Sequence, residues 1–278
     1  MQQRAQVAFY YWATIPAVGI MVAFFLVPLA GVLWLSVSEP TLGFQNYHAL
    51  WENALLQRVW MNTLRVCAVT TVISVLLGYV VAYAMAHASE RHRTLMMFCI
   101  VLTFWLSVLI RAFAWVMLLR GEGLLNGLLL GLGVIDQPLR LVRNETGVLI
   151  GMVHYMLPVA ILPMYANMRS VSARYVDAAR SLGAKPWQSF LWVYLPLTKP
   201  GILAAAILVF IFTVGFYITP AILGGGRVVM IAEYLRVSFE ETLRWGYATM
   251  IASTLLIVLC VALALLARIV DLKKVFGS

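Results

Sequence analysis

Six stretches of this chain are long and apolar enough to cross a bilayer, and they constrain its fold more than any other feature. A membrane-spanning helix needs about 20 consecutive, mostly apolar residues. Only 11% of the residues are charged, against about 25% in ordinary globular proteins. The sequence therefore predicts an all-α integral membrane protein in which residues 1–278 form a single transmembrane domain with six transmembrane helices. The predicted helices are residues 12–35, 63–86, 95–118, 147–168, 201–223 and 247–267.

The cations in the loops indicate how these helices are oriented. The two termini and the loops at 87–94 and 169–200 hold eleven lysines and arginines against three acids, whereas the other side, counted with its helix ends, holds eight of each sign. Cytoplasmic loops of membrane proteins carry the excess of Lys and Arg, so both termini and the loop 169–200 are expected in the cytoplasm. The net charge of +9 is spread over short loops and does not indicate a nucleic-acid partner.

The chain lacks the residue patterns of an enzyme or of a nucleotide-binding protein. Gly183-Ala184-Lys185 lacks the preceding glycine and the following hydroxyl of a phosphate-binding loop. The histidines and cysteines are scattered, with no spacing that suits a metal. We therefore expect no cofactor and no metal in this chain. An ion-coupled secondary carrier or a membrane-embedded enzyme stays as an alternative, although the carrier needs intramembrane acids and the enzyme a nucleophile or metal cluster.

A polar island separates the fourth and fifth apolar stretches. Residues 172–182 predict a short helix that Ser172 can cap, Gly183 interrupts it, and Pro186 suits the first turn of a second helix. Two short amphipathic helices cannot form a core of their own, so they need a partner surface. The alternative is an amphipathic helix that lies on lipid.

This island resembles the cytoplasmic loop of permease subunits of binding-protein-dependent ABC importers. Their signature is Glu-Ala-Ala, three residues, Gly, nine residues and Ile-x-Leu-Pro. The match here is Asp177-Ala178-Ala179, Gly183 and Val193-Tyr194-Leu195-Pro196, with conservative changes at 177 and 193. Three further motifs are similar to the spermidine/putrescine-type subgroup: Asn62-Thr63-Leu64, Arg111-Ala112-Phe113-Ala114-Trp115 and Thr219-Pro220-Ala221-Ile222-Leu223-Gly224-Gly225.

The resemblance implies the MetI-like fold of a type I ABC importer permease, in the bacterial cytoplasmic (inner) membrane and surrounded by its lipid. It implies that an ABC ATPase dimer, which holds ATP and Mg²⁺, docks at the cytoplasmic loop. It also implies a second permease subunit, and a periplasmic or lipid-anchored solute-binding protein that meets the outer loops. The residues expected to couple to the ATPase are Asp177, Ala178, Ala179, Gly183, Pro186, Leu195 and Pro196.

Arg111 is the one charge well inside a predicted span, which makes it a functional hypothesis. It is either a snorkelling arginine that braces the outer gate or pairs with a loop acid such as Glu122, or a residue that contacts the substrate. Trp115 lies one helical turn further on. His154 is expected to be a hydrogen-bonded histidine of the bundle. The fifth span offers hydroxyls and aromatic faces, which can hold amines or simply pack, from Thr213, Phe216, Tyr217 and Thr219.

The substrate expected from these residues is a small nitrogen-containing solute. Polyamine permeases often carry an acidic residue after the glycine that is equivalent to Gly215, where this chain has Phe216. A polycation would find little compensating charge in such a path. A zwitterion or small anion, such as an amino acid derivative, an opine or an aminophosphonate, therefore competes with a polyamine.

Overall fold

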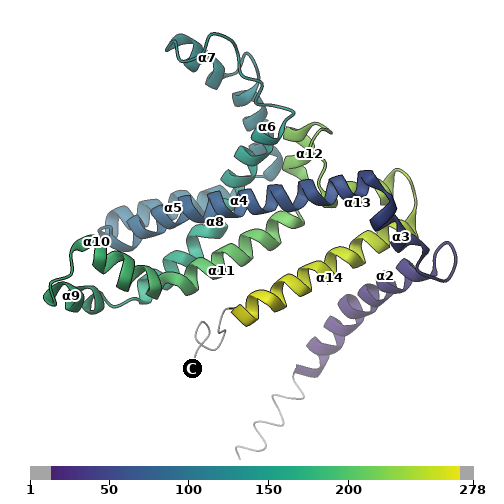
Figure 1. The fold of residues 1–278 in the computed structure, drawn as a ribbon, viewed down its shortest axis with the longest axis horizontal. Helices are drawn as coiled ribbons and strands as arrows, with labels where there is room; N and C mark the ends of the chain where they lie inside the picture. Colours follow the sequence, from purple (N-terminus) through teal and green to yellow (C-terminus); the bar gives the residue numbers. More distant parts are fainter. Residues whose placement is uncertain (1–13, 270–278) are drawn as a thin grey trace, which may run out of the picture. The chain divides into compact units, whose positions relative to one another are not determined.

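The computed structural model describes residues 14–269, with side chains described up to residue 264, and every regular element in this range is a helix (Figure 1). The predicted all-α membrane fold is confirmed. Five helices are each long and apolar enough to cross a membrane. The helix pair Glu90–Trp105 and Val108–Gly131 reaches that length only when its two bent parts are taken together, and counting the pair as one span gives six spans in the described chain. Both predicted cytoplasmic termini, and residues 12 and 13 of the first span, lie outside the described residues. The other five spans, by length and composition, are Thr14–Ser38, Ala54–His87, Glu145–Ser170, Pro186–Val214 and Trp245–Ala264.

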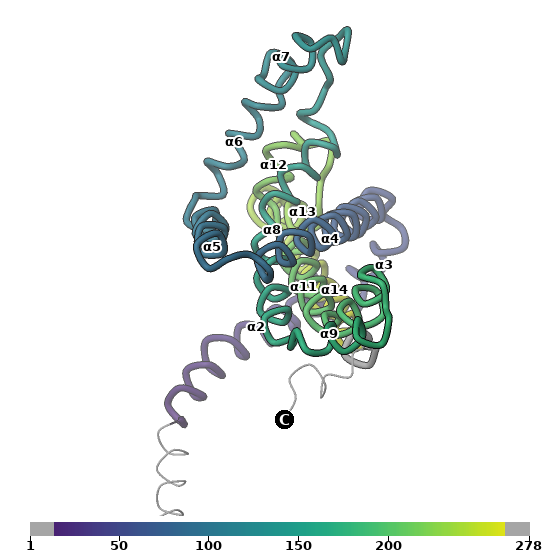
Figure 2. The backbone as a smooth tube through the Cα atoms, turned by 90° about the vertical axis from the view of Figure 1, so that its left-hand side faces the viewer, coloured from purple at the N-terminus to yellow at the C-terminus, as the bar shows by residue number. Residues whose placement is uncertain are grey.

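The prediction of one continuous helix over 95–118 is wrong. Helix α5 (Glu90–Trp105) and helix α6 (Val108–Leu119) meet at a bend of 99°. Leu106 and Ser107 between them are extended, with ψ angles of 131° and 137°, which interrupts the helical hydrogen bonds. In Figure 2, α5 is viewed nearly end-on and α6 rises away from it toward α7 (Leu124–Gly131). The break contains neither Gly nor Pro, so no helix-breaking residue marks it within the apolar stretch of the sequence.

The predicted span over 201–223 is also divided. Helix α11 (Leu195–Val214) ends before Gly215, and a separate helix α12 (Ile218–Gly224) follows. At its other end, α11 begins earlier than predicted, because α10 (Pro186–Ser189) and a π-helical turn η2 (Phe190–Tyr194) lead into it without a break. These three elements form one rod of 29 residues.

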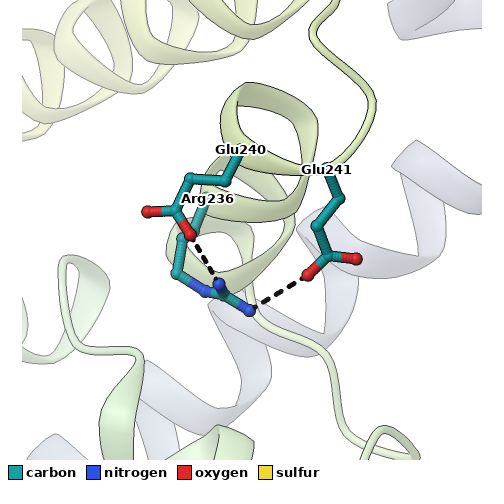
Figure 3. A network of polar contacts seen from close by, with 3 residues as sticks. All are labelled: Arg236, Glu240 and Glu241. Carbon is teal, nitrogen blue, oxygen red and sulfur yellow. Dashed lines mark hydrogen bonds and ion pairs between the residues drawn. The ribbon is translucent and has the colours of Figure 1, made fainter.

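The chain divides into two compact units, and all predicted site residues belong to the second, which comprises residues 58–234 and 261–278. The first unit comprises residues 1–57 and 235–260. Its described elements are η1 (Val22–Leu26), α2 (Val27–Ser38), α3 (Gln45–Glu52) and parts of α4 (Ala54–His87), α13 (Ile231–Glu240) and α14 (Trp245–Ile269). In this unit, Arg236 pairs with Glu240 at 2.7 Å and with Glu241 at 3.5 Å (Figure 3).

The core of the second unit is built from α4, α8 (Glu145–Ser170) and α11, with α8 and α11 in the most extensive contact (Figure 1). Glycines allow the close approach. A Cβ atom at Gly78 of α4 would lie 3.1 Å from the Cβ of Ala160, and one at Gly201 of α11 would lie 2.7 Å from the Cβ of Asn167. Small residues at such contacts let membrane helices pack backbone to backbone. Helices α9 (Ala173–Ser181) and α10 lie at one end of this core, and α6 and α12 at the other (Figure 1).

Candidate functional site

The polar island folds as predicted into a short helix, a glycine turn and a second helix. The N–H of Gly183 donates to the carbonyl of Arg180 at 2.9 Å, and the N–H of Ala184 donates to that of Ala179 at 3.1 Å. This pair of bonds is a Schellman motif, which needs a left-handed residue after the helix, and Gly183 supplies it with φ +90°. Ser172 does stand at the N-cap of α9, but its hydroxyl makes no capping hydrogen bond.

The second helix of the island begins at Pro186 and supports the first. Pro186 takes the first turn of α10, where its missing N–H costs nothing, and the N–H of Lys185 donates to Oε1 of Gln188 at 2.8 Å. Helix α9 contacts both α10 and η2. Because α10 and η2 continue into α11, the position of α9 is tied to one end of a long membrane helix.

Aromatic rings join this assembly to the end of α4. Tyr83 of α4 stands perpendicular to the rings of Phe190 and Tyr194, with centroids 5.6 Å and 5.4 Å away. A cavity of about 210 Å³ lies beside them, with Asp177 and Val176 of α9 in its lining. A displacement of α9 would therefore shift the residues that pack on α4 as well as those that continue into α11.

Most of the predicted coupling residues face outward at this end of the unit. Asp177, Ala178 and Gly183 are exposed, as are Pro186 and Pro196, while Ala179 and Leu195 are half-buried. Within the described chain Asp177 forms no ion pair. Leu182, next to the glycine turn, is 89% exposed. This end of the unit thus presents a short helix with an exposed face, which carries one carboxylate outside any ion pair, small residues and an exposed apolar tip.

At the opposite end, Arg111 is buried against Tyr155 of α8. Its side chain is 8% exposed, and its guanidinium carbon lies 4.2 Å from the centroid of the Tyr155 ring. No ion pair in the described part of the chain joins it to Glu122, and its Nε has no hydrogen-bond partner there. Of the two interpretations of Arg111, the pairing with Glu122 is not observed.

Helix α8 brings three of the predicted path residues together. Trp115 donates from Nε1 to Nδ1 of His154 at 3.1 Å, so the hydrogen-bonded histidine is confirmed. Tyr155 packs on Phe216 with ring centroids 4.4 Å apart. Arg111, Trp115 and Phe216 thus meet on consecutive residues of α8. Tyr155 was missed in the sequence because an aromatic residue in an apolar helix has no distinguishing signal.

The three hydroxyl-bearing residues predicted for the path differ in how exposed they are. Thr213 is fully buried, and its Oγ1 donates to the carbonyl of Val209 at 2.7 Å, so its donor is used within its own helix. Thr219 is 3% exposed, and its methyl group packs where a Cβ at Gly151 would lie 2.7 Å away. Tyr217 is 40% exposed, at the break between α11 and α12. Only Tyr217 of these three is open to a ligand.

Residues 74–275 match the family model described as binding-protein-dependent transport system inner membrane component. The chain is 35% identical over 219 residues to the spermidine/putrescine transport system permease protein PotB of Haemophilus influenzae, which covers 78% of this chain and 76% of that protein. It is 32% identical over 214 residues to the protein of the same name from Escherichia coli, covering 77% and 78%.

The chain resembles a bacterial alginate ABC transporter in complex with an alginate pentasaccharide-bound periplasmic protein, with a TM-score of 0.81 over 100% of this chain and 98% of that chain. An amino acid ABC transporter structure, described as containing histidines, gives a TM-score of 0.52 over 80% of this chain and 96% of that chain. Identities of 16% in both cases make these likenesses of fold alone.

Proposed function

This chain belongs to the family of binding-protein-dependent transport system inner membrane components, as a permease subunit of an ABC importer and not an enzyme, and on that premise we propose that an ATPase dimer docks on α9 and drives import of a small nitrogen-containing solute. The chain is a multi-pass inner membrane protein, and its partners are a binding protein and other ABC transporter subunits. The finer assignments are that ATP and Mg²⁺ are held by the ATPase and that a second permease completes the path.

The observation that carries this proposal is the exposed, preorganised helix α9. A helix of 9 residues is too short to be stable alone, yet here its C-terminus is closed by the Schellman motif and its flank rests on α10 and η2. Asp177 offers a carboxylate for a charge-assisted hydrogen bond, and Ala178 leaves room for a partner backbone. The intact spacing from Asp177 to Pro196 favours a groove on another protein over a lipid surface as the partner of this helix.

The rod of α10, η2 and α11 connects this helix to the far end of the path. Its 29 residues extend about 40 Å at 1.5 Å per residue, and it ends just before Phe216. Phe216 packs on Tyr155, which in turn lies under Arg111. Closure of the ATPase dimer would shift α9 and the rod together, and the aromatic contact at the other end would open or close. Rigid-body motion of this kind gives alternating access.

The test of this assignment is ATP-dependent uptake by the purified importer in proteoliposomes. We expect the ATPase to co-purify with the permease, and uptake to require ATP on the side that α9 faces. Uptake that follows an imposed proton or sodium gradient without ATP would instead support the ion-coupled carrier. Failure of any ATPase to associate with the chain would contradict the docking role of α9.

Two classes of substrate have specific support. The names of the relatives concern spermidine and putrescine, which supports a polyamine. The buried guanidinium of Arg111, with no acid paired to it in the described chain, supports a zwitterion or small anion that brings its own negative group. ATPase stimulation by binding protein loaded with putrescine, with spermidine or with an aminophosphonate separates the two. Stimulation by the polyamines alone would reject the zwitterion.

A further inference from the structure

A basic cavity lies at the end of the second unit opposite α9. Its volume is about 630 Å³, and it is enclosed mainly by residues 137–144, with contributions from the end of α6 and from Arg227. Of its eleven lining residues, three are arginines and none is acidic. Within the described chain no ion pair involves any of the three, which are Arg140, Arg143 and Arg227.

Asn126 of α7 anchors the loop that forms this cavity through side-chain hydrogen bonds. Asn126 is fully buried, and its Nδ2 donates to the carbonyls of Arg120 and Leu139 at 3.1 Å and 3.0 Å. Its Oδ1 accepts from the N–H of Leu139 at 2.8 Å. One buried amide thus satisfies both backbone groups of Leu139, a residue that lines the cavity, and so fixes this part of the loop.

Arg143 is placed by contacts to α12. Its N–H donates to the carbonyl of Leu223 at 2.7 Å, and its backbone has φ +60°, which is uncommon for a residue with a side chain. Gly225 makes room for its stem, since a Cβ there would lie 2.7 Å from Cγ of Arg143. Glu145, two residues further on, is occupied by an ion pair with Arg65 and does not neutralise the cavity. The guanidinium groups are therefore free to bind an external anion.

We propose that this cavity receives a carboxylate side chain from the surface of the solute-binding protein, and so orients that protein on the permease; the inference rests on the proposed function. The cavity lies at the end opposite the ATPase-facing helix, where a binding protein must deliver its solute. Guanidinium groups bind carboxylates through paired hydrogen bonds, which specify orientation as well as attraction. The clustered positive charges of the three arginines also attract an acidic partner from a distance, which raises the rate of docking.

The experiment uses the importer with both permeases and the ATPase in phosphatidylcholine nanodiscs. The Kd of its purified, solute-loaded binding protein is measured together with the ATPase rate. We expect the double variant Arg143→Glu/Arg227→Glu to weaken binding by about 30-fold or more, with the basal ATPase rate unchanged. Wild-type affinity should fall between 50 mM and 500 mM salt, by roughly tenfold or more, and that of the variant should fall much less.

A matched control and a second variant keep the outcome clear. Arg58→Glu reverses the charge of one exposed arginine outside the cavity, which is half the charge change of the double variant, and equal weakening by this control would overturn the proposal. Should charge reversal prevent folding, Arg143→Asn/Arg227→Gln removes the charges while Asn tolerates the left-handed backbone. An unchanged Kd in either double variant also overturns it. The ATPase rate is also measured in nanodiscs that contain phosphatidylglycerol. If this lipid changes the rate of the wild type but not that of the variant, and the Kd is the same for both, the cavity binds a lipid headgroup and the proposal is overturned.

If the proposed function itself is wrong, the same experiment gives a different result. In that case the wild-type complex would show no stimulation by binding protein and no ATP-driven uptake. If only the cavity assignment is wrong, the wild type is stimulated normally and the variants behave like it.

Discussion

The guanidinium carbon of Arg111 lies 4.2 Å from the centroid of the Tyr155 ring, and the same ring packs on Phe216 with ring centroids 4.4 Å apart. Three elements meet in this stack: α6, α8 and the break after α11. Because Arg111 is 8% exposed and its Nε has no partner, the aromatic ring is the main compensation for a buried charge. The stack is the point at which the two interpretations of Arg111 can be separated.

Replacing Arg111 by Met should distinguish substrate contact from bracing. If Arg111 binds an anionic group, Arg111→Met lowers uptake of a zwitterion about tenfold or more, because a hydrogen bond to a charged group contributes roughly 1.5–3 kcal/mol. Uptake of putrescine should stay the same or rise. The measurement is initial uptake rate in proteoliposomes, with Arg120→Met as the control on an exposed arginine. An equal loss for both substrates would assign Arg111 to bracing the helices.

Replacing Tyr155 tests the stack itself. Tyr155→Phe keeps the ring and should leave transport within about twofold of wild type, because a cation–π contact does not need the hydroxyl. Tyr155→Leu removes the ring and should lower coupled transport by about 2- to 30-fold, the equivalent of roughly 0.5–2 kcal/mol. Basal ATPase activity and membrane insertion serve as controls. Equal activity of the two variants would show that the ring is not needed.

Substitution of Gly183 should uncouple transport without preventing insertion. A side chain at φ +90° costs roughly 1–2 kcal/mol, although a Cβ there would have nothing within 4 Å. Gly183→Arg is expected to leave the protein in the membrane but to abolish uptake, because the turn that presents α9 is lost. Gly133 is the matched control, since it has φ +68° and equally open surroundings. Retained uptake in Gly183→Arg, or loss in Gly133→Arg as well, would count against the coupling role.

Asp177 should matter for the complex and not for the stability of the chain. It is exposed and forms no ion pair in the described chain, so Asp177→Asn is expected to change the free energy of unfolding by less than about 0.5 kcal/mol. Its loss should weaken ATPase association about tenfold, measured by titration of the purified ATPase. Asp136→Asn is the control, an exposed acid in the loop at the other end of the unit. Normal association of Asp177→Asn would exclude a charged anchor at this position.

Gly201 should be intolerant of large side chains because of its contact with α8. A Cβ at this position would already lie 2.7 Å from the Cβ of Asn167. Gly201→Leu is expected to cost about 1–3 kcal/mol or more by overpacking, and to lower the temperature of unfolding in detergent. Gly127→Leu in α7, where a Cβ meets nothing within 4 Å, should be near neutral. Equal Tm values for the two variants would mean that α8 and α11 can separate without cost.

The sequence by itself determined the membrane class, the approximate positions of the apolar stretches and the position of the short helix α9. These features depend on local properties. Long apolar runs need a bilayer, Gly183 permits a left-handed turn, and Pro186 suits a helix start. The spacing from Asp177 to Pro196 is likewise a local pattern, and it sufficed to predict the family.

Only the tertiary structure decided where helices break and which distant residues meet. The bend at Leu106 and Ser107 has no Gly or Pro to mark it, and it turns α6 by 99°. Arg111 reaches Tyr155, and Arg143 approaches Arg227 around one cavity, although each pair is more than forty residues apart. Such contacts depend on how α8 packs against α6, α11 and α12, which is set by side chains on several helices at once. A pattern along one segment therefore cannot contain them.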